Sequence, residues 1–366
     1  MITNNKKASI WSKMIDITRH YLYVIIYLVA IITYSINFCF VFYILKRIKL
    51  LNNICTKILN IMLMKFQSIV KCAMLIGGMD LYVYKEKDID LIFNKNVVII
   101  PNHLSELDSM FIGALYNDIF PQFYKVITFA KNTIRFYPFI GWITLAHDTI
   151  FVQNKNTSPN FNQHNYIENK LKNENNNNFN KNIIIFIEGT TFSKKVKQTR
   201  ELFNGSISYN NLLIPKTNGL HMIHSNIDID GEIYLTLKFE GDYKIEDYTI
   251  AGLLKGIKPK SIHIFVDTKP YEKKNNQQLL LDREKYNEEV YKNFKTIDDK
   301  LNNNISFWKN NYDSKKLGIT FYDIIYFTIF LMSFVYTFKG LSYSWLYRIY
   351  FTIVPIVYLI CGFIEV

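Results

Sequence analysis

The sequence predicts an α/β domain whose central sheet is covered by helices on both faces, with membrane segments at both ends of the chain. Short apolar runs alternate with helical stretches between residues 80 and 267. Most of these runs are apolar throughout rather than alternating, which is typical of strands buried on both faces. Long blocks without charge lie near the two ends of the chain, and blocks of that length can cross a bilayer.

The N-terminal block comes first. Residues 21–45 contain no charged side chain, and Arg19 and Lys46 close the block on its two sides. The block is long enough to cross the apolar part of a bilayer with some tilt. A cleaved signal peptide would have a shorter apolar run and a small-residue cleavage site. We therefore expect a tail and a retained transmembrane anchor within residues 1–50.

The next segment, residues 51–79, predicts amphipathic helices that are apolar on one side and basic on the other. Such helices lie on a membrane surface, and the alternative is a surface for a partner helix. The net charge of +12 calls for an anionic partner. Membrane lipids fit better than nucleic acid, because the cationic residues are scattered and no nucleic-acid recognition pattern accompanies them.

The α/β domain is expected over residues 80–310. The strand candidates are residues 97–100, 126–129, 183–187, 212–214, 233–239 and 262–266. An Asn-rich stretch at about 154–182 is expected to be a surface insertion, because polar low complexity does not bury a core. Residues 271–310 are charged and predict helix. The four cysteines are isolated, which favours a reducing compartment and neither a disulfide framework nor a zinc site.

Residues 311–366 predict a C-terminal membrane hairpin. Its two apolar blocks are residues 319–338 and 349–364, separated by Lys339 and Arg348. Asp323 lies early in the first block, and we expect it at the membrane interface. The alternative is that these blocks are buried core helices of a soluble domain.

The strand candidate at residues 97–100 runs into a segment that carries candidate chemistry. Asn102, His103 and Asp108 follow it directly. A strand-to-helix junction with this spacing can bring His103 and Asp108 together. A carboxylate on one imidazole nitrogen leaves the other free to take a proton from an alcohol. The spacing alone is a weak signal, since an incidental histidine at a capped helix start gives the same pattern.

The domain contains three further segments with candidate site residues, and two of these segments follow strand candidates. Loops that follow parallel strands meet at one edge of an open α/β sheet, where ligands usually bind. The first segment holds Gly141, Trp142 and Phe151, the second holds Glu188, Gly189, Thr190 and Thr191, and the third holds Pro215, Lys216, Thr217 and Gly219.

Taken together and in this order, the segments resemble the motifs of the glycerolipid acyltransferases. The resemblance is to the 1-acyl-sn-glycerol-3-phosphate acyltransferase family, and most of all to its lysocardiolipin-acyltransferase-like branch, over about residues 70–310. The residues that meet its four motifs are Asn102, His103 and Asp108; Gly141, Trp142 and Phe151; Glu188, Gly189 and Thr190; and Leu213, Pro215, Thr217 and Gly219. The resemblance implies a mixed central sheet flanked by helices.

Two positions depart from the family pattern. Thr191 stands where the family has an arginine after Glu-Gly-Thr, and Asn154 replaces the arginine that usually closes the second motif. In the family both arginines are associated with the phosphate of the acceptor. We expect a lysine to supply this charge, although without the bidentate fork of arginine. The candidates are Lys131, Lys194, Lys195 and Lys216.

The resemblance implies an acyl-CoA-dependent O-acyltransferase that converts 1-acyl-sn-glycerol-3-phosphate into phosphatidic acid. His103, oriented by Asp108, would be the base. Asn102, Glu188, Thr190 and their neighbours would bind substrate. The expected partners are acyl-CoA, a lysophospholipid and membrane lipids, with no nucleic acid, cofactor or metal. The default location is the endoplasmic reticulum membrane, with the domain facing the cytosol. The alternatives are another acceptor, such as lysophosphatidylinositol or lysocardiolipin, and a catalytically idle lipid-binding homologue.

Overall fold

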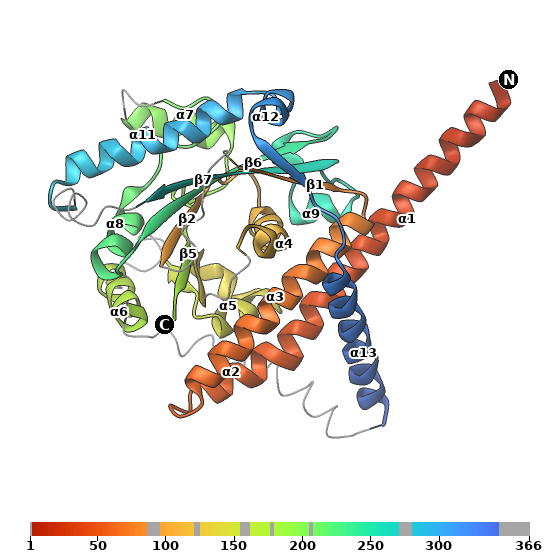
Figure 1. Cartoon of the computed structure of the whole chain (residues 1–366), viewed down its shortest axis with the longest axis horizontal. Coiled ribbons are helices and arrows are strands. Elements are labelled where there is room, and N and C mark those ends of the chain that lie inside the picture. Colours follow the sequence, from red (N-terminus) through yellow and green to blue (C-terminus); the bar gives the residue numbers. More distant parts are fainter. Residues whose placement is uncertain are drawn as a thin grey trace.

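The computed structural model describes residues 2–85, 96–120, 125–153, 162–175, 179–204, 208–270 and 280–343. A single sheet of eight strands forms its centre, in the order β4-β3-β5-β2-β6-β7-β1-β8 (Figure 1). The strands are β1 (Asp80–Lys85), β2 (Val97–Pro101), β3 (Lys125–Lys131), β4 (Ile150–Val152), β5 (Lys181–Ile184), β6 (Gly231–Glu240), β7 (Ser261–Pro270) and β8 (Asp313–Lys316).

The sheet is mixed, as the resemblance implied. β4, β3, β5, β2 and β6 are parallel to one another. β7 is antiparallel to β6, β1 is parallel to β7, and β8 is antiparallel to β1. The carboxyl ends of the five parallel strands therefore lie at one edge of the sheet, where open α/β sheets place their ligands.

Helices cover both faces of the sheet, and β2 shows why. Val97 and Ile99 belong to one apolar cluster, while Val98 and Ile100 belong to another, because successive strand residues point to opposite faces. The first cluster includes residues of α4 (Asp108–Ile119), and the second includes residues of α6 (Gln163–Asn175), α8 (Thr217–Asn226) and α11 (Arg283–Asn302). Figure 1 shows α4 and α11 on opposite sides of the sheet.

The N-terminal segment forms a helical hairpin against the α4 side of the sheet. α1 (Ile2–Tyr34) continues through a π-helix, η1 (Ser35–Phe40), into α2 (Val41–Lys46), and α3 (Asn52–Ile76) returns alongside α1. Two helical stretches, Lys13–Lys46 and Asn52–Ile76, are long and apolar enough to cross a membrane. About half of each most apolar window is buried inside the protein, 47% in the first and 56% in the second. The hairpin is therefore packed onto the domain.

The first C-terminal apolar block forms α13 (Phe321–Tyr343), which packs on α3. Asp323, expected at a membrane interface, is buried against α3 within the protein. Its carboxylate lies 2.8 Å from the ammonium group of Lys71, which also binds Asp118 of α4 at 3.0 Å. A buried charge requires such a partner. The second apolar block, residues 349–364, lies outside the described residues.

The remaining helices of the described residues are short. They are η2 (Asn132–Phe136), α5 (Ile140–Ala146), α7 (Lys194–Asn204), η3 (Ile245–Asp247), α9 (Ile250–Leu254) and α12 (Ile305–Asn311). α11 and α12 fall in the segment predicted to be helical, of which residues 271–279 are outside the described part of the chain.

Several local predictions need correction. Residues 212–214 form a loop rather than a strand, because the Leu213 N–H donates to the Glu188 carboxylate and not to a neighbouring strand. β5 ends at Ile184, three residues before the predicted end. The Asn-rich stretch is not wholly on the surface. It contains α6, whose Ile167 and Leu171 are buried one helical turn apart.

Candidate active site

The site begins where β2 ends. Asn102 is fully buried and hydrogen-bonds the backbone of Leu237 in β6 twice. Its Nδ2 donates to the carbonyl oxygen at 3.1 Å, and its Oδ1 accepts from the N–H at 2.6 Å. The Asn102 side chain thus continues the ladder between β2 and β6 by one step. This fixes the backbone just before His103, so Asn102 is a positioning residue.

The imidazole and the carboxylate lie together, as the spacing predicted. His103 Nδ1 is 2.9 Å from Asp108 Oδ2, which also accepts a hydrogen bond from the Ser105 N–H at 3.0 Å. Asp108 is fully buried at the start of α4, and burial raises its pKa, while the bond to His103 lowers it in part. The His103 side chain is 20% exposed. Its Nε2 accepts no hydrogen bond from the described residues, so this nitrogen is available to a ligand.

Glu188 joins the loops around His103. Its carboxylate is fully buried and accepts the His103 N–H at 2.7 Å on one oxygen and the Leu213 N–H at 2.8 Å on the other. Burial raises the pKa of Glu188 to about 8, although the two N–H bonds act in the opposite direction. A further bond, from the Phe192 N–H to the His103 carbonyl oxygen at 2.8 Å, closes the contact from the loop after β5. The Phe186 ring lies 4.3 Å from the imidazole, between ring centroids.

Arg200, on α7, also connects these loops, a role that no sequence pattern predicted. Its guanidinium donates to the carbonyl oxygens of Glu188 at 2.9 Å and Ile214 at 3.1 Å. It therefore bridges the Glu-Gly-Thr loop and the loop before α8. α7 is a polar helix, and nothing in the spacing of its charged residues distinguishes Arg200 from its neighbours.

A group of cationic side chains lies beside this centre. The pKa of Lys216 is lowered first by partial desolvation of its ammonium group and then by its proximity to Arg200 and Lys131. Lys131 ends β3 and is exposed, as is Lys216. The Lys216 stem runs past Gly189, whose φ of +68° favours glycine, and a Cβ there would lie 3.3 Å from Lys216 Cδ. These contacts place positive charge next to the Glu-Gly-Thr loop.

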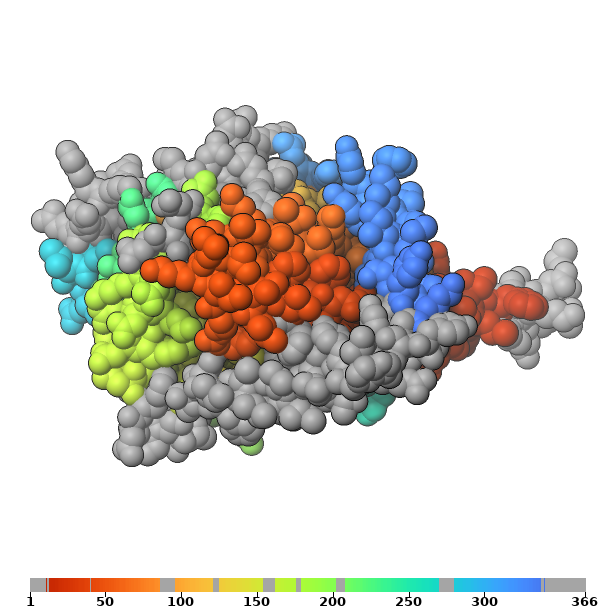
Figure 2. Space-filling model, turned by 90° about the horizontal axis from the view of Figure 1, so that it is seen from below, coloured from red at the N-terminus to blue at the C-terminus, as the bar shows by residue number. Residues whose placement is uncertain are grey.

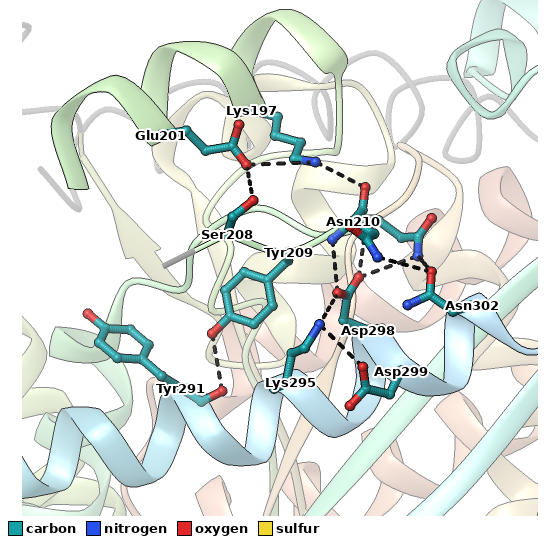
Figure 3. Close-up of polar contacts among 11 residues, drawn as sticks. Lys197, Glu201, Ser208, Tyr209, Asn210, Tyr291, Lys295, Asp298, Asp299 and Asn302 are labelled. Atoms are coloured by element: carbon teal, nitrogen blue, oxygen red, sulfur yellow. Dashed lines mark hydrogen bonds and ion pairs between the residues drawn. The ribbon is translucent and has the colours of Figure 1, made fainter. Parts of the chain in front are cut away.

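Side chains of α11 bind the backbone of the loop that precedes Leu213 (Figure 3). Asp298 is fully buried and accepts the N–H groups of Asn210 at 2.9 Å and Asn211 at 2.7 Å. Lys295 lies 2.9 Å from the same carboxylate. Because Leu213 in turn donates to Glu188, α11 stabilises the loop that contacts the His103 centre. The sequence did not indicate this role for Asp298.

The remaining predicted site residues lie in different places. Thr190 and Thr191 are half-buried in the loop after β5, and Lys194 and Lys195 are exposed at the start of α7. Pro215, Thr217 and Gly219 shape the start of α8, where Gly219 packs on Ile185. Gly141 packs on the backbone of Arg135, and a Cβ there would meet the Arg135 carbonyl oxygen at 2.2 Å. No hydrogen bond joins Gly141 to the His103 centre in the described part of the chain.

Metal ligands do not gather at this centre. Among the described residues there is no group of three or more His, Cys, Asp or Glu side chains placed to hold a metal ion. The chemistry available to the described side chains here is that of a base, His103, with a buried carboxylate behind it and cationic groups beside it.

One family model and one solved structure are similar to parts of this chain. No curated protein matches the chain in sequence. One solved structure, the 1-acyl-sn-glycerophosphate (LPA) acyltransferase PlsC from Thermotoga maritima, is 15% identical with a TM-score of 0.46, covering 78% of this chain and 99% of that one. The model of the Acyltransferase family matches residues 81–229, which include His103, Asp108 and Glu188. Residues 81–229 are therefore similar to the acyltransferase family.

Proposed function

We propose that the protein is a membrane-associated, acyl-CoA-dependent lysophospholipid acyltransferase. In this proposal it esterifies the free glycerol hydroxyl of 1-acyl-sn-glycerol-3-phosphate and gives phosphatidic acid. The observation that carries the proposal is the pairing of His103 with the buried Asp108 at 2.9 Å. The pair lies in the region that matches the acyltransferase family model, with Nε2 available to a ligand.

The proposed reaction is direct acyl transfer. His103 Nε2 takes the proton of the glycerol hydroxyl as the oxygen attacks the thioester carbonyl carbon of acyl-CoA. The tetrahedral intermediate then collapses, the C–S bond breaks, and the imidazolium returns its proton to the departing CoA thiolate. Asp108 holds Nδ1–H and stabilises the imidazolium between the two steps, as a buried carboxylate does in other histidine bases. No covalent acyl-enzyme is needed.

The cationic group beside the base supports an acceptor with a phosphate. Lys216 and Lys131 lie close enough to each other and to Arg200 for their charges to interact. In this proposal they take the place of the arginine that Thr191 replaces. Because a lysine ammonium binds phosphate as a point charge rather than in a bidentate fork, we expect weaker discrimination among phosphate-bearing acceptors.

The apolar surface supports a membrane location. Large apolar side chains are exposed along α1, α2, α3 and α13, which pack on one another. They include Trp11, Ile15, Tyr21, Leu22, Ile25, Ile44, Ile54, Phe321, Ile329, Met332 and Val335. An exposed apolar surface of this extent marks a membrane or protein contact. We propose that it lies in the bilayer of the endoplasmic reticulum, with the domain on the cytosolic side, where the proposed substrates partition.

The test uses membranes that contain the full chain, labelled oleoyl-CoA and a panel of lysophospholipids. The variants are His103→Ala and, as a matched control, His164→Ala, a histidine whose side chain is 69% exposed on α6. Acylation of lysophosphatidic acid that is lost only in His103→Ala supports the proposal. A preference for lysophosphatidylinositol or lysocardiolipin, made plausible by Thr191, keeps the chemistry and changes the acceptor. No acylation by folded wild-type protein on any acceptor indicates an idle lipid-binding homologue.

A further inference from the structure

Arg135 is a buried arginine with unpaired N–H groups. It lies in η2, which directly follows β3, and only 4% of the residue is exposed. Its Nη1 donates to the Asn132 Oδ1 at 3.0 Å. Its Nε and Nη2 are buried and have no hydrogen-bond partner among the described residues. Burying a charge without partners is costly, so a ligand that supplied acceptors here would stabilise the folded protein.

The unpaired groups share one edge of the guanidinium. In this planar group the Nε–H bond and one Nη2–H bond are parallel, and together they can donate to two oxygens of one phosphate or carboxylate. The bond to Asn132 leaves this edge untouched, because it uses Nη1. Arg135 therefore presents a complete bidentate donor edge.

Two aromatic rings lie beside the guanidinium. The Phe151 and Phe136 ring centroids are 5.3 and 5.7 Å from its central carbon. Aromatic rings attract a cation, but they carry no oxygen that could accept from Nε or Nη2. Phe136 is 37% exposed, and Thr133 and Tyr137 are exposed on either side of Arg135. The donor edge therefore lies just below the surface, and a ligand reaches it when the Phe136 ring moves.

Gly141 of the second motif sets the position of Arg135. A Cβ at this glycine would lie 2.2 Å from the Arg135 carbonyl oxygen, so only glycine lets α5 pack this closely on η2. The chain just before α5 also contacts the N-terminal hairpin, since the Ser35 hydroxyl of η1 donates to the Phe139 carbonyl oxygen at 3.0 Å. Figure 2 shows this hairpin between α6 and α13. One short helix therefore separates Arg135 from the helices that carry the exposed apolar surface.

The strand order separates Arg135 from His103. Phe151 is in β4, and β4 is three strands from β2, or roughly 14 Å at the usual strand spacing. Phe151 lies opposite Ala130 of β3, and the registers of β3, β5 and β2 put this position level with the end of β2. Arg135 is therefore at the same edge of the sheet as His103, but well away from the hydroxyl that reacts in the proposed function.

We propose that Arg135 binds a phosphate of the acyl donor. The identity of this ligand rests on the proposed function, in which the donor is acyl-CoA. In lysophosphatidic acid the hydroxyl and the phosphate are on neighbouring glycerol carbons, so the acceptor phosphate must lie close to His103. In acyl-CoA the long pantetheine arm separates the thioester from the diphosphate and the ribose 3′-phosphate. A thioester at His103 therefore allows these phosphates to reach farther along the same edge, where Arg135 lies.

The experiment measures binding of CoA itself to the full-length protein in detergent by isothermal titration calorimetry, so that the result does not depend on turnover. Arg135→Met removes the charge and keeps most of the side-chain volume, whereas Arg135→Lys keeps the charge and loses the bidentate edge. Arg283→Met, at an exposed position at the start of α11, is the matched control. Melting curves without ligand, and KM for oleoyl-CoA and for lysophosphatidic acid, are measured on the same proteins.

We expect Arg135→Met to weaken CoA binding about 100-fold, tenfold for each of two charge-assisted bonds. It should raise KM for oleoyl-CoA and leave KM for lysophosphatidic acid unchanged. Arg135→Lys should weaken CoA binding about tenfold, and Arg283→Met should not weaken it. Without ligand, Arg135→Met should melt at the same or a higher temperature, because an unpaired buried charge is removed.

Equal CoA binding by the wild-type protein and Arg135→Met would overturn the proposal, and so would an effect confined to KM for lysophosphatidic acid. If the wild-type protein binds no CoA, the proposed function fails instead. Inorganic pyrophosphate then tests Arg135 by itself. Pyrophosphate binding that is lost in Arg135→Met keeps the assignment of Arg135 to a phosphate, and any other result overturns it.

Discussion

Two histidine–aspartate pairs of the chain, His103 with Asp108 and His147 with Asp148, have different contacts in the structure. His103 and Asp108 are five residues apart and bond each other directly at 2.9 Å. His147 and Asp148 are adjacent, and each bonds another partner, Tyr34 for the histidine and two lysines for the aspartate. The first pair leaves one imidazole nitrogen available, whereas His147 is buried and neutral. Sequence adjacency is thus a poorer guide to a working pair than a spacing that spans a turn.

The difference has a physical cause. The Pro-Asn-His turn after β2 and the first turn of α4 bring the His103 imidazole over the Asp108 carboxylate. Asp148, by contrast, has a positive φ of 55° in the turn before β4 and faces lysines from α2 and β3. One aspartate therefore bonds an imidazole, which it would orient as a base in the proposed function, and the other compensates buried cations.

Replacing Asp108 with Asn should produce the largest loss of activity. His103 Nδ1 and the Ser105 N–H both bond Oδ2 of Asp108, so an amide oxygen in that place keeps both bonds. The amide carries no negative charge, however, and it no longer stabilises the imidazolium that forms when His103 takes a proton. We expect kcat/KM for acyl transfer to fall about 10²–10⁴-fold, the usual contribution of a general base, with little change in melting temperature. Unchanged kcat/KM would remove His103 from the mechanism.

Replacing Asp148 with Asn should have the opposite result, a loss of stability with no loss of activity. Lys46 and Lys125 would keep their buried charges without a full counter-charge. We expect the free energy of unfolding to fall by about 3 kcal/mol, measured by urea denaturation, while kcat per folded molecule stays the same. Asp313→Asn, at an exposed position of β8, is the control. If Asp148→Asn impaired turnover without a loss of stability, the two pairs would not be divided as described.

Replacing Glu188 with Gln should have an intermediate effect. It should lower the free energy of unfolding by an amount that depends on pH. One of the two backbone N–H groups bound to Glu188 would lose its acceptor, at a cost of about 1–3 kcal/mol. In the wild-type protein the folded pKa of Glu188 is about 8, against an ordinary value of 4.5. Between these values the unfolded chain binds fewer protons, so the free energy of unfolding should decrease as pH rises from about 5 to about 8.

In Glu188→Gln no carboxyl group titrates at this position. The free energy of unfolding of the variant should therefore depend less steeply on pH over the same range. Urea denaturation at several pH values measures both slopes. Parallel slopes for the two proteins would mean that Glu188 does not titrate in that range.

Replacing Lys216 with Gln should have the smallest effect, and this effect should be on acceptor binding. We expect KM for lysophosphatidic acid to rise about tenfold through loss of a charge-assisted bond to the phosphate, with kcat retained. Lys172→Gln, at a position of α6 where the side chain is 59% exposed, is the matched control. A fall in kcat with an unchanged KM would place Lys216 in the chemical step instead of in acceptor binding.

The sequence predicted much of the centre because its residues follow parallel strands. Runs such as 97–100 end at one edge of the sheet, so His103 and Glu188 meet there. The features that the sequence did not predict depend on tertiary contacts. β8 is a polar, fully exposed edge strand and carries no apolar signal. Arg200 and Asp298 act through backbone groups of distant loops, and no local pattern indicates such partners.

The position of β1 has a consequence for how the protein forms during synthesis. β1 pairs with β7 and β8, so Leu81 lies opposite Ile262 and Val83 opposite Lys315. Contacts between residues so far apart in the chain close late, because a long loop must be ordered first. Pairing of β2, β3 and β5 needs only the chain up to Ile184. We expect one side of the sheet to assemble on the ribosome while β1 waits, unpaired, for the last third of the chain to emerge.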